Sequence, residues 1–195
     1  MIDYIKGQII ELTPTELILE NQGIGYSILI SLQTFEAFQA KSQAVAYIHH
    51  YIREEEELYF GFATKDEREL FRLLISVSGI GVASARMMLS TLSSEEIRQA
   101  ILSEDINRIK SVKGIGLKSA QRLVLELKDK VVKGEGAESP VLFQANNSAI
   151  VDEATNALVM LGFSKPNIGK VMPGILKEQP NARVEDIIKA ALKKL

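Results

Sequence analysis

The chain has 195 residues, of which 46% are hydrophobic and 25% charged, and its net charge is −2. This balance excludes a disordered chain and fits a globular protein of one to three domains, while the absence of cysteine excludes disulfides, thiolate metal sites and a cysteine nucleophile. No apolar run approaches the roughly 18–20 residues that a membrane span needs, and the N-terminus lacks the marks of a signal peptide, so we expect a cytoplasmic protein.

Residues 1–63 predict a small β-barrel. Short runs rich in Ile, Leu, Tyr and Phe alternate with turn signals such as Thr13-Pro14. One short helix, at 33–40, is expected between the third and fourth strands. Five short strands in a segment of this length are typical of an OB-fold barrel. The expected strands are 2–12, 16–20, 26–32, 44–52 and 58–62.

Residues 64–133 change to a helical period and predict an all-helical domain. Thr64 and Glu67 have the spacing of a capping box, and so do Ser93 and Glu96. The first box is followed by apolar residues at helical spacing, which we expect to form a buried face: Leu70, Phe71, Leu74 and Ile75.

Residues 134–147 are rich in Gly, Pro, Ser and Asn and predict a flexible linker. Residues 148–195 predict a small three-helix bundle, with helices at 150–161, 165–177 and 184–195 and with Gly162 just beyond the end of the first. Such a bundle is marginal alone but suits a tethered docking module.

The charge is unevenly divided along the chain. Residues 1–63 carry 3 Lys and Arg against 9 Asp and Glu, residues 64–133 carry 13 against 9, and residues 134–195 carry 7 against 7. Local charge decides what a surface attracts. The central segment, with an excess of four positive charges, is therefore the candidate for binding a polyanion.

The same central segment contains an internal repeat. Residues 74–88 align without gaps on residues 109–123, at an offset of 35 positions. Both copies contain S-V-x-G-I-G, followed after two residues by S-A. Two glycines around an apolar residue allow a sharp turn between two helices, with the Ile packed beneath it and the backbone open to close approach.

The helix that follows such a turn offers free amides and the positive end of its dipole, which together suit a phosphate oxygen. A single copy would be explained equally well as a tight turn, but two copies in the basic segment favour DNA-backbone binding without base specificity. A double hairpin of this kind should hold a duplex from its minor-groove side. The candidate residues are Gly79, Ile80, Gly81, Ser84, Gly114, Ile115, Gly116, Lys118, Ser119 and Arg122.

At these residues the sequence resembles the RuvA family, the Holliday-junction recognition subunits of the bacterial branch-migration machine. The resemblance covers the whole chain, in the order barrel, hairpin pair, linker and three-helix module. Besides the two hairpins it rests on the N-terminal M-I-x-Y-I-K-G and on G-I-G-Y, Y-F-G-F, L-E-L-K-D-K and A-L-x-x-L-G-F, which begin at Met1, Gly23, Tyr59, Leu125 and Ala157.

The resemblance implies an OB barrel, a helix–hairpin–helix domain and a C-terminal module that is similar to ubiquitin-associated domains. It implies a homotetramer, in some members a pair of tetramers, that holds an open, square four-way junction during recombination and DNA repair in the SOS response. The implied partners are the hexameric ATPase RuvB, bound through the C-terminal module, and the resolvase RuvC. The chain itself has no G-x-x-x-x-G-K-[ST] phosphate loop, so ATP hydrolysis is assigned to the partner and no cofactor or metal is expected.

The chain departs from the family at the hairpins. Some members have a lysine soon after the first hairpin, where this chain has Val82 and Ala83, and another after the second, where it has Leu117 before Lys118. The first hairpin is therefore expected to rely on its backbone amides and on Ser84.

An acidic run, residues 54–57, lies between the last two expected strands. By itself it is a solvated hairpin tip or a cation site, although neighbouring strand residues point to opposite faces and do not converge as ligands must. The resemblance implies instead an acidic pin, Glu54 and Glu55, that projects into the centre of the junction and repels its phosphates.

Three smaller expectations remain. His49 and His50 are adjacent on one strand, so one should face the core and the other solvent. The turn Leu161, Gly162 and Phe163 is either a helix stop or a contact for the motor partner. The alternative function is a structure-specific nuclease, which would need carboxylates that converge on a metal ion.

Overall fold

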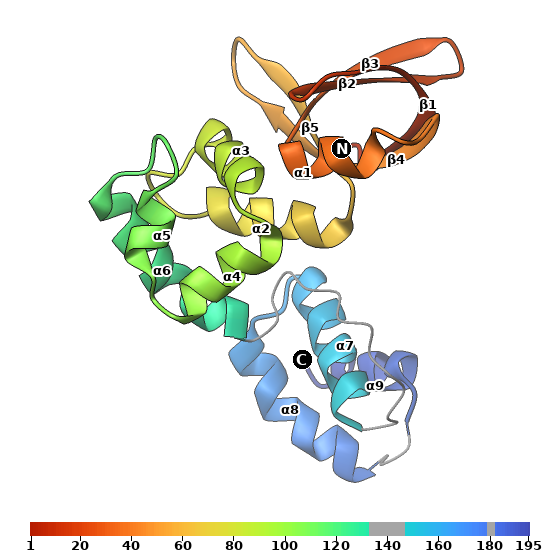
Figure 1. Ribbon diagram of the computed structural model, residues 1–195. Coiled ribbons are helices and arrows are strands. Elements are labelled where there is room, and N and C mark those ends of the chain that lie inside the picture. Colours follow the sequence, from red (N-terminus) through yellow and green to blue (C-terminus); the bar gives the residue numbers. More distant parts are fainter. Residues whose placement is uncertain (133–146, 179–181) are drawn as a thin grey trace. The chain divides into compact units, whose positions relative to one another are not determined.

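The structure, a computed structural model, describes residues 1–132, 147–178 and 182–195. The chain forms two compact units, Met1–Ser139 and Pro140–Leu195 (Figure 1). The predicted linker 134–147 lies outside the described residues apart from Asn147, where the first helix of the second unit begins.

The first unit starts with a closed five-stranded barrel in the order β1-β2-β3-β5-β4. The barrel closes through an antiparallel β1–β4 ladder and a short parallel β3–β5 pairing. The predicted OB-fold barrel is thereby confirmed. The strands are β1 (Tyr4–Leu12), β2 (Glu16–Asn21), β3 (Ile24–Ile30), β4 (Gln43–Ile52) and β5 (Glu57–Phe62).

Helix α1 (Leu32–Phe38) connects β3 to β4, close to the predicted position. Strand β3 ends at Ile30, two residues earlier than expected, because Ser31 caps α1 and its side chain accepts a hydrogen bond from the Thr34 amide. Ser31 is thus a helix cap rather than part of the strand.

Strand β5 directs two of its large side chains, Phe60 and Phe62, to the outside of the barrel. Between them lies the inward position Gly61, where a Cβ would lie only 2.4 Å from Cγ2 of Ile28. Phe60 and Phe62 alternate with it and join the core of the following helices, with ring centroids 5.4 and 4.9 Å from that of Phe71. Barrel and helices therefore share packed aromatic surface and form one unit.

The helical part of the first unit packs around this aromatic cluster. As predicted, Leu70, Phe71 and Leu74 are fully buried, while Ile75 is half-buried. The helices are α2 (Lys65–Ile75), α3 (Val82–Thr91), α4 (Ser94–Leu102), α5 (Ile106–Lys110) and α6 (Leu117–Val132).

The two predicted capping boxes have different outcomes. Ser93 and Glu96 exchange both hydrogen bonds and form a complete box at the start of α4. At α2, Thr64 accepts from the Glu67 amide at 3.1 Å, but the Glu67 carboxylate does not return to the Thr64 amide. The box at α2 is therefore only half formed, because the carboxylate is used elsewhere.

The Glu67 carboxylate joins the barrel to α2. It accepts hydrogen bonds from the hydroxyls of Ser31 (2.6 Å) and Thr34 (2.9 Å) and from the amide of Ala63 (3.2 Å). Burial raises the pKa of the Glu67 carboxyl, and the donated hydrogen bonds partly offset that rise. All three donors come from the barrel side, so the side chain fixes α2 against α1 and β5.

The second unit is a bundle of α7 (Asn147–Met160), α8 (Lys165–Glu178) and α9 (Val184–Leu192), in agreement with the predicted three helices. Its core includes Ala154, Leu158, Ile168, Ile175 and Ile187. No helix in the described ranges has the length and apolar character to cross a bilayer.

We predict that Glu67→Ala lowers the free energy of unfolding by about 2–4 kcal/mol, because it leaves buried hydroxyl and amide donors without an acceptor. Urea unfolding followed by circular dichroism measures the change. Glu36→Ala, an exposed carboxylate on α1, is the control and should change stability by less than about 0.5 kcal/mol. A loss below about 1 kcal/mol for Glu67→Ala would contradict its role as a joint.

Candidate nucleic-acid interface

The two glycine loops of the repeat have the same backbone conformation. Gly79 has φ +91° and Gly114 has φ +90°, values that L side chains rarely adopt. In each loop the Ile amide donates to the Val carbonyl three residues earlier, at 3.0 Å for Ile80 and 3.1 Å for Ile115. The repeat in sequence is therefore a repeat in structure.

The Ile side chain of each loop anchors that loop in the protein core. Ile80 and Ile115 are each 5% exposed and belong to the core cluster of the helical region. The repeated sequence pattern places both Ile80 and Ile115 among the candidate DNA-contacting residues. Their buried side chains leave only the backbone of these two positions available to a ligand.

The second glycine of each loop has no intramolecular explanation. Gly81 is the N-cap of α3 with φ −89° and ψ 171°, ordinary extended backbone, and a Cβ at Gly81 or Gly116 would meet nothing within 4 Å. A side chain at either position would fit the protein itself. Such a side chain would instead obstruct a ligand that approaches the first turns of α3 and α6 from outside the protein.

These first turns have amides that a ligand can use. An α-helix leaves its first amides without intrahelical partners, and no side chain caps those of α3. Ser84 lies in the first turn of α3 and Ser119 in that of α6, and both are half-buried. Each helix start therefore combines outward amides with a hydroxyl.

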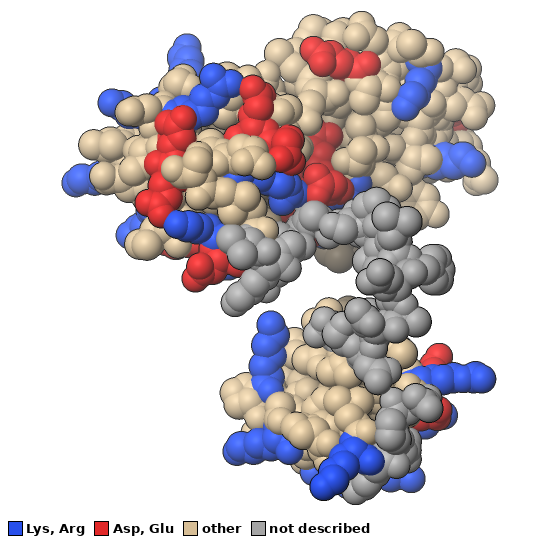
Figure 2. Space-filling model, turned by 60° about the horizontal axis from the view of Figure 1, so that its bottom comes forward, with Lys and Arg blue, Asp and Glu red and all other residues tan. Residues whose placement is uncertain are grey.

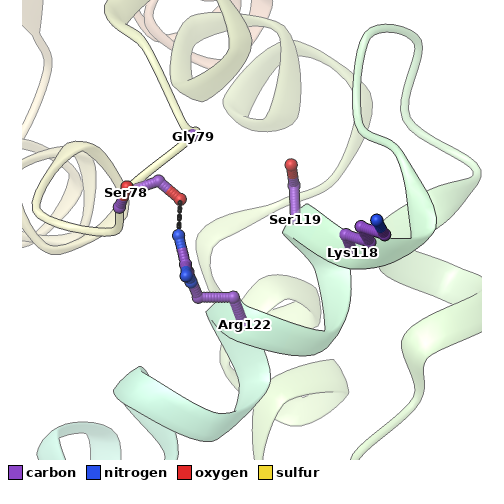
Figure 3. Close-up of a pocket in the computed structure, with 5 residues that line it drawn as sticks. All are labelled: Ser78, Gly79, Lys118, Ser119 and Arg122. Carbon is purple, nitrogen blue, oxygen red and sulfur yellow. Dashed lines mark hydrogen bonds between the residues drawn. The ribbon is translucent and has the colours of Figure 1, made fainter.

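The two loops face each other's helices. The Cβ position of Gly79 lies 3.4 Å from the Ser119 hydroxyl, and that of Gly114 lies 3.9 Å from the Ser84 hydroxyl. The first loop and the start of α6 enclose a cavity of about 230 Å³ (Figure 3). Its lining residues are Ser78, Gly79, Lys118, Ser119 and Arg122.

Elsewhere in the helical region most basic side chains are neutralised by acidic ones. Arg98 pairs with Asp66 at 2.6 Å, Arg108 pairs with Glu96 at 2.8 Å, and Lys128 pairs with Glu104. Figure 2 shows positive and negative side chains interspersed on this part of the surface.

The lysines at the two loops differ from these. Within the part of the chain that the structure describes, neither Lys113 nor Lys118 has an acidic side chain within ion-pair distance. Arg122 has only a distant one, Glu126 at 3.6 Å. Positive charge is therefore unneutralised at the loops, where the open glycines lie.

The acidic run forms the turn of the β4–β5 hairpin, which extends from the barrel (Figure 1). The Arg53 amide donates to the Glu56 carbonyl at 2.8 Å, and the Glu56 amide faces the Arg53 carbonyl at 3.4 Å. Glu54 and Glu55 are therefore the two residues of a tight hairpin loop, and both are exposed. The two residues named as the pin lie at the extreme tip.

Glu57 is held back from this tip. Its carboxylate lies 2.8 Å from Nε2 of His50 and accepts a hydrogen bond from the Tyr59 hydroxyl at 3.3 Å. Burial and the neighbouring Glu57 carboxylate raise the pKa of Tyr59, so this hydroxyl stays protonated as a donor. Glu57 thus braces the base of the hairpin, a role that the run of four identical residues did not reveal.

The expectation that one of the two histidines faces solvent is wrong. The His49 ring lies 5.3 Å from Phe71 and 6.5 Å from Phe60, because α2 covers this outer face of the barrel, and both histidines are half-buried. Burial, followed by the charges of Arg72 and Arg68, lowers the pKa of His49. Among the described residues, no three His, Asp or Glu side chains are grouped closely enough to hold a metal ion.

The Leu161-Gly162-Phe163 turn is a helix stop of Schellman type. The Gly162 amide donates to the Val159 carbonyl at 3.0 Å, and the Phe163 amide donates to the Leu158 carbonyl at 3.1 Å. Gly162 has φ +100°, and Phe163 packs against the bundle core. Leu161 remains 59% exposed, so it is the apolar side chain of the three that is free to meet another molecule.

The fold and the site define a class of proteins in which an OB barrel is followed by a tandem helix–hairpin–helix domain. Comparison with known families agrees with this description. Residues 1–61 match the model of the RuvA N terminal domain, residues 71–129 match that of the SAM-like helix-hairpin-helix tandem, and residues 149–195 match that of the RuvA C-terminal domain.

Curated relatives match the chain from end to end. Proteins from Christiangramia forsetii (50% identity), Bacteroides fragilis (49%) and Parabacteroides distasonis (50%) are each covered completely and cover this chain completely. All three bear the name Holliday junction branch migration complex subunit RuvA. The chain belongs to the RuvA family.

The two glycines of each loop should respond differently to alanine. We predict that Gly79→Ala or Gly114→Ala lowers the free energy of unfolding by about 1–3 kcal/mol, because each forces a positive φ on a residue with a Cβ. Gly81→Ala and Gly116→Ala should leave stability unchanged or raise it by up to about 1 kcal/mol. Chemical unfolding measures all four variants. Equal destabilisation at all four positions would show that the second glycine also has a structural role.

Proposed function

We propose that this chain is the junction-binding subunit of a DNA branch-migration complex, which holds a four-way junction while a separate ATPase, RuvB, moves the DNA. By this proposal the chain is not itself an enzyme. The observation that carries the proposal is the pair of loops with matching backbone conformation, whose second glycines have no contact within the protein that requires a glycine. Their openness is explained by close contact with a backbone outside the protein.

The DNA contacts proposed are those of phosphate binding. The first-turn amides of α3 and α6 would donate to phosphate oxygens, with the hydroxyls of Ser84 and Ser119 beside them and the charges of Lys118 and Arg122 on α6. None of these groups reads a base edge, so the grip is independent of sequence. Because the two loops lie in one domain, they suit the phosphate backbones of the two strands of a single duplex.

Selection of a junction requires a further element, and the acidic hairpin supplies one. Glu54 and Glu55 place fixed carboxylates at an exposed tip. Where the strands of a junction meet, their phosphates crowd together, and carboxylates at that point would repel them and keep the arms apart. Attraction at the hairpins and repulsion at the tip would favour an open, square junction.

Four duplex arms call for four copies of the grip, so we propose a homotetramer with cyclic symmetry, with two tetramers on one junction as an extension of it. Exposed apolar side chains on the barrel are available for contacts between subunits, since Tyr4 is 57% and Ile52 66% exposed. The acidic tips of four subunits would then surround one axis.

For the C-terminal bundle we propose contact with RuvB through the turn of Leu161, Gly162 and Phe163. The exposed Leu161 side chain supports a direct contact, whereas the packed Phe163 would support the shape of the turn. In this proposal the resolvase RuvC joins the larger complex, and the protein acts in the bacterial cytoplasm in recombination, DNA repair and the SOS response.

The test is a binding comparison between a four-way junction and a duplex of the same arm sequence, with the oligomer mass measured on the same sample by native mass spectrometry. We expect tetramers that prefer the junction by at least about 100-fold, because four arms are engaged at once. Equal affinity for both DNAs would overturn junction selection.

Gly81→Ala with Gly116→Ala is the matched variant for the hairpins, since it should fold normally. We expect it to weaken binding of both DNAs by about tenfold or more, because each methyl group stands where a phosphate must approach. Unchanged affinity would remove the loops from the interface. Incubation of the junction with the protein and Mg²⁺ should leave the DNA uncut, and site-directed cutting would favour the nuclease alternative.

The acidic tip is tested by Glu54→Gln with Glu55→Gln. We expect duplex affinity to stay unchanged, junction affinity to rise by a factor of about 2–10, and the arms to lose their open geometry, because the repulsion at the centre is removed. Energy transfer between dyes on opposite arms measures the geometry.

The control for this variant is Glu11→Gln with Glu36→Gln, which removes two exposed carboxylates from the same unit away from the tip. It should leave both arm geometry and junction affinity as in the unaltered protein. If the tip variant also matches the unaltered protein in both measurements, the pin role is wrong for this chain.

A further inference from the structure

The two copies of the repeat differ in charge at three matched positions. At the offset of 35 residues, Lys118 and Arg122 of the second copy correspond to Ala83 and Met87 of the first. In the loop itself the second copy again has the cation, because Lys113 corresponds to Ser78 of the first copy. Taken alone, the first hairpin has no basic side chain at any of these positions.

The structure places Arg122 of the second copy at the first loop, with Lys118 farther along the same cavity. Lys118 and Arg122 start on α6, yet they line one cavity with Ser78 and Gly79 (Figure 3). An Nη1 atom of Arg122 lies 3.5 Å from the Ser78 carbonyl oxygen, directed at the loop. The cavity therefore combines the glycine loop of one copy with the helix start of the other.

The second loop is paired with the start of α3 in the same way. Ser84, in the first turn of α3, is the nearest side chain to the Cβ position of Gly114, just as Ser119 is the nearest to that of Gly79. The position that corresponds to Ser78 in this second loop is Lys113, which is exposed. Here the start of α3 contributes the uncharged Ala83 and Met87, and the loop itself contributes the cation, Lys113.

From this arrangement we infer that the phosphate-binding units are not the single hairpins but two composite sites, each built from one glycine loop and the helix start of the other copy. This inference rests on the proposed DNA-backbone binding. Site one comprises Ser78, Gly79, Lys118, Ser119 and Arg122. Site two comprises Lys113, Gly114, Ala83 and Ser84.

The ligand of each site is one phosphodiester group. In site one the anion would meet the Ser119 hydroxyl and two cations, of which Lys118 has no acidic partner among the described residues. Arg122 has only weak partners in the free protein, at 3.5 and 3.6 Å, so a phosphate can replace both. Site two has a single cation, which the loop supplies.

Composite sites would account for the absence of a lysine at Val82 or Ala83. A lysine on the first turn of α3 would serve site two, which already has Lys113. The first loop obtains its charge from α6 instead. Each site therefore keeps at least one cation, and the second copy supplies it from α6 in site one and from its loop in site two.

The test moves one charge between the two sites. Lys118→Ala removes a cation from site one, and Ser78→Lys returns one to the same cavity, whereas Ala83→Lys adds the same charge to site two. Affinity for a duplex is measured for Lys118→Ala alone and with each addition, by fluorescence anisotropy at fixed salt. We expect Ser78→Lys to restore the affinity lost in Lys118→Ala about threefold to tenfold better than Ala83→Lys does.

The reciprocal arm starts from Lys113→Ala, where Ala83→Lys should be the better rescue and Ser78→Lys the poorer. Each addition is also made in the unaltered protein, so that a general effect of added charge is subtracted. Equal rescue by both additions, or better rescue of Lys118→Ala by Ala83→Lys, would overturn the composite sites in favour of independent hairpins.

Lys130→Ala, on the same helix as Lys118 but outside the cavity, is the control for loss of one charge. It should weaken binding less than Lys118→Ala does, and should not be rescued by Ser78→Lys. The slope of log affinity against log salt should fall by about one per subunit for Lys118→Ala. If the unaltered protein bound no DNA, the proposed function itself would fail, an outcome separate from the pattern of rescue.

Discussion

The aromatic contact between β5 and α2 is the constraint on which the rest of the first unit depends. Gly61 leaves room for the Ile28 side chain inside the barrel, and the flanking Phe60 and Phe62 are thereby directed outward onto Phe71. Strand β5 is also one arm of the acidic hairpin and leads directly into α2. One packed cluster therefore holds both the acidic tip and the glycine loops on a common base, and the buried Glu67 reinforces it with hydrogen bonds from three barrel residues.

A shared base matters because the two charged regions act in opposite directions. An acidic first segment would weaken binding of DNA if it could move freely against the hairpins, since attraction and repulsion would average out over the surface. Because the barrel and the helices pack as one unit, the carboxylates of Glu54 and Glu55 keep a fixed place relative to the open glycines. The net charge of −2 conceals this division.

The sequence predicted those features that depend on neighbours along the chain. The five strands, the helix between β3 and β4 and the glycine loops follow from periodicity, turn residues and an internal repeat, all of which are local. Features that depend on distant partners were missed. The Glu67 carboxylate leaves the predicted capping box for Ser31 and Thr34, more than thirty positions away, and His49 is covered by a helix whose docking face no local pattern specifies.

The candidate site shows the same limit in a more informative way. Alignment of the two copies identified Gly79 and Gly114, but it assigned each lysine to the hairpin nearest in sequence, which made the absence of one at Val82 and Ala83 look like a loss. The fold pairs each loop with the other helix, so the charge of a site is the sum over two copies. The loop geometry is fixed by the positive φ of the first glycine and by the buried Ile, neither of which depends on the surrounding charges. A composite site can therefore take its cation either from the loop, as with Lys113, or from the opposite helix, as with Lys118 and Arg122.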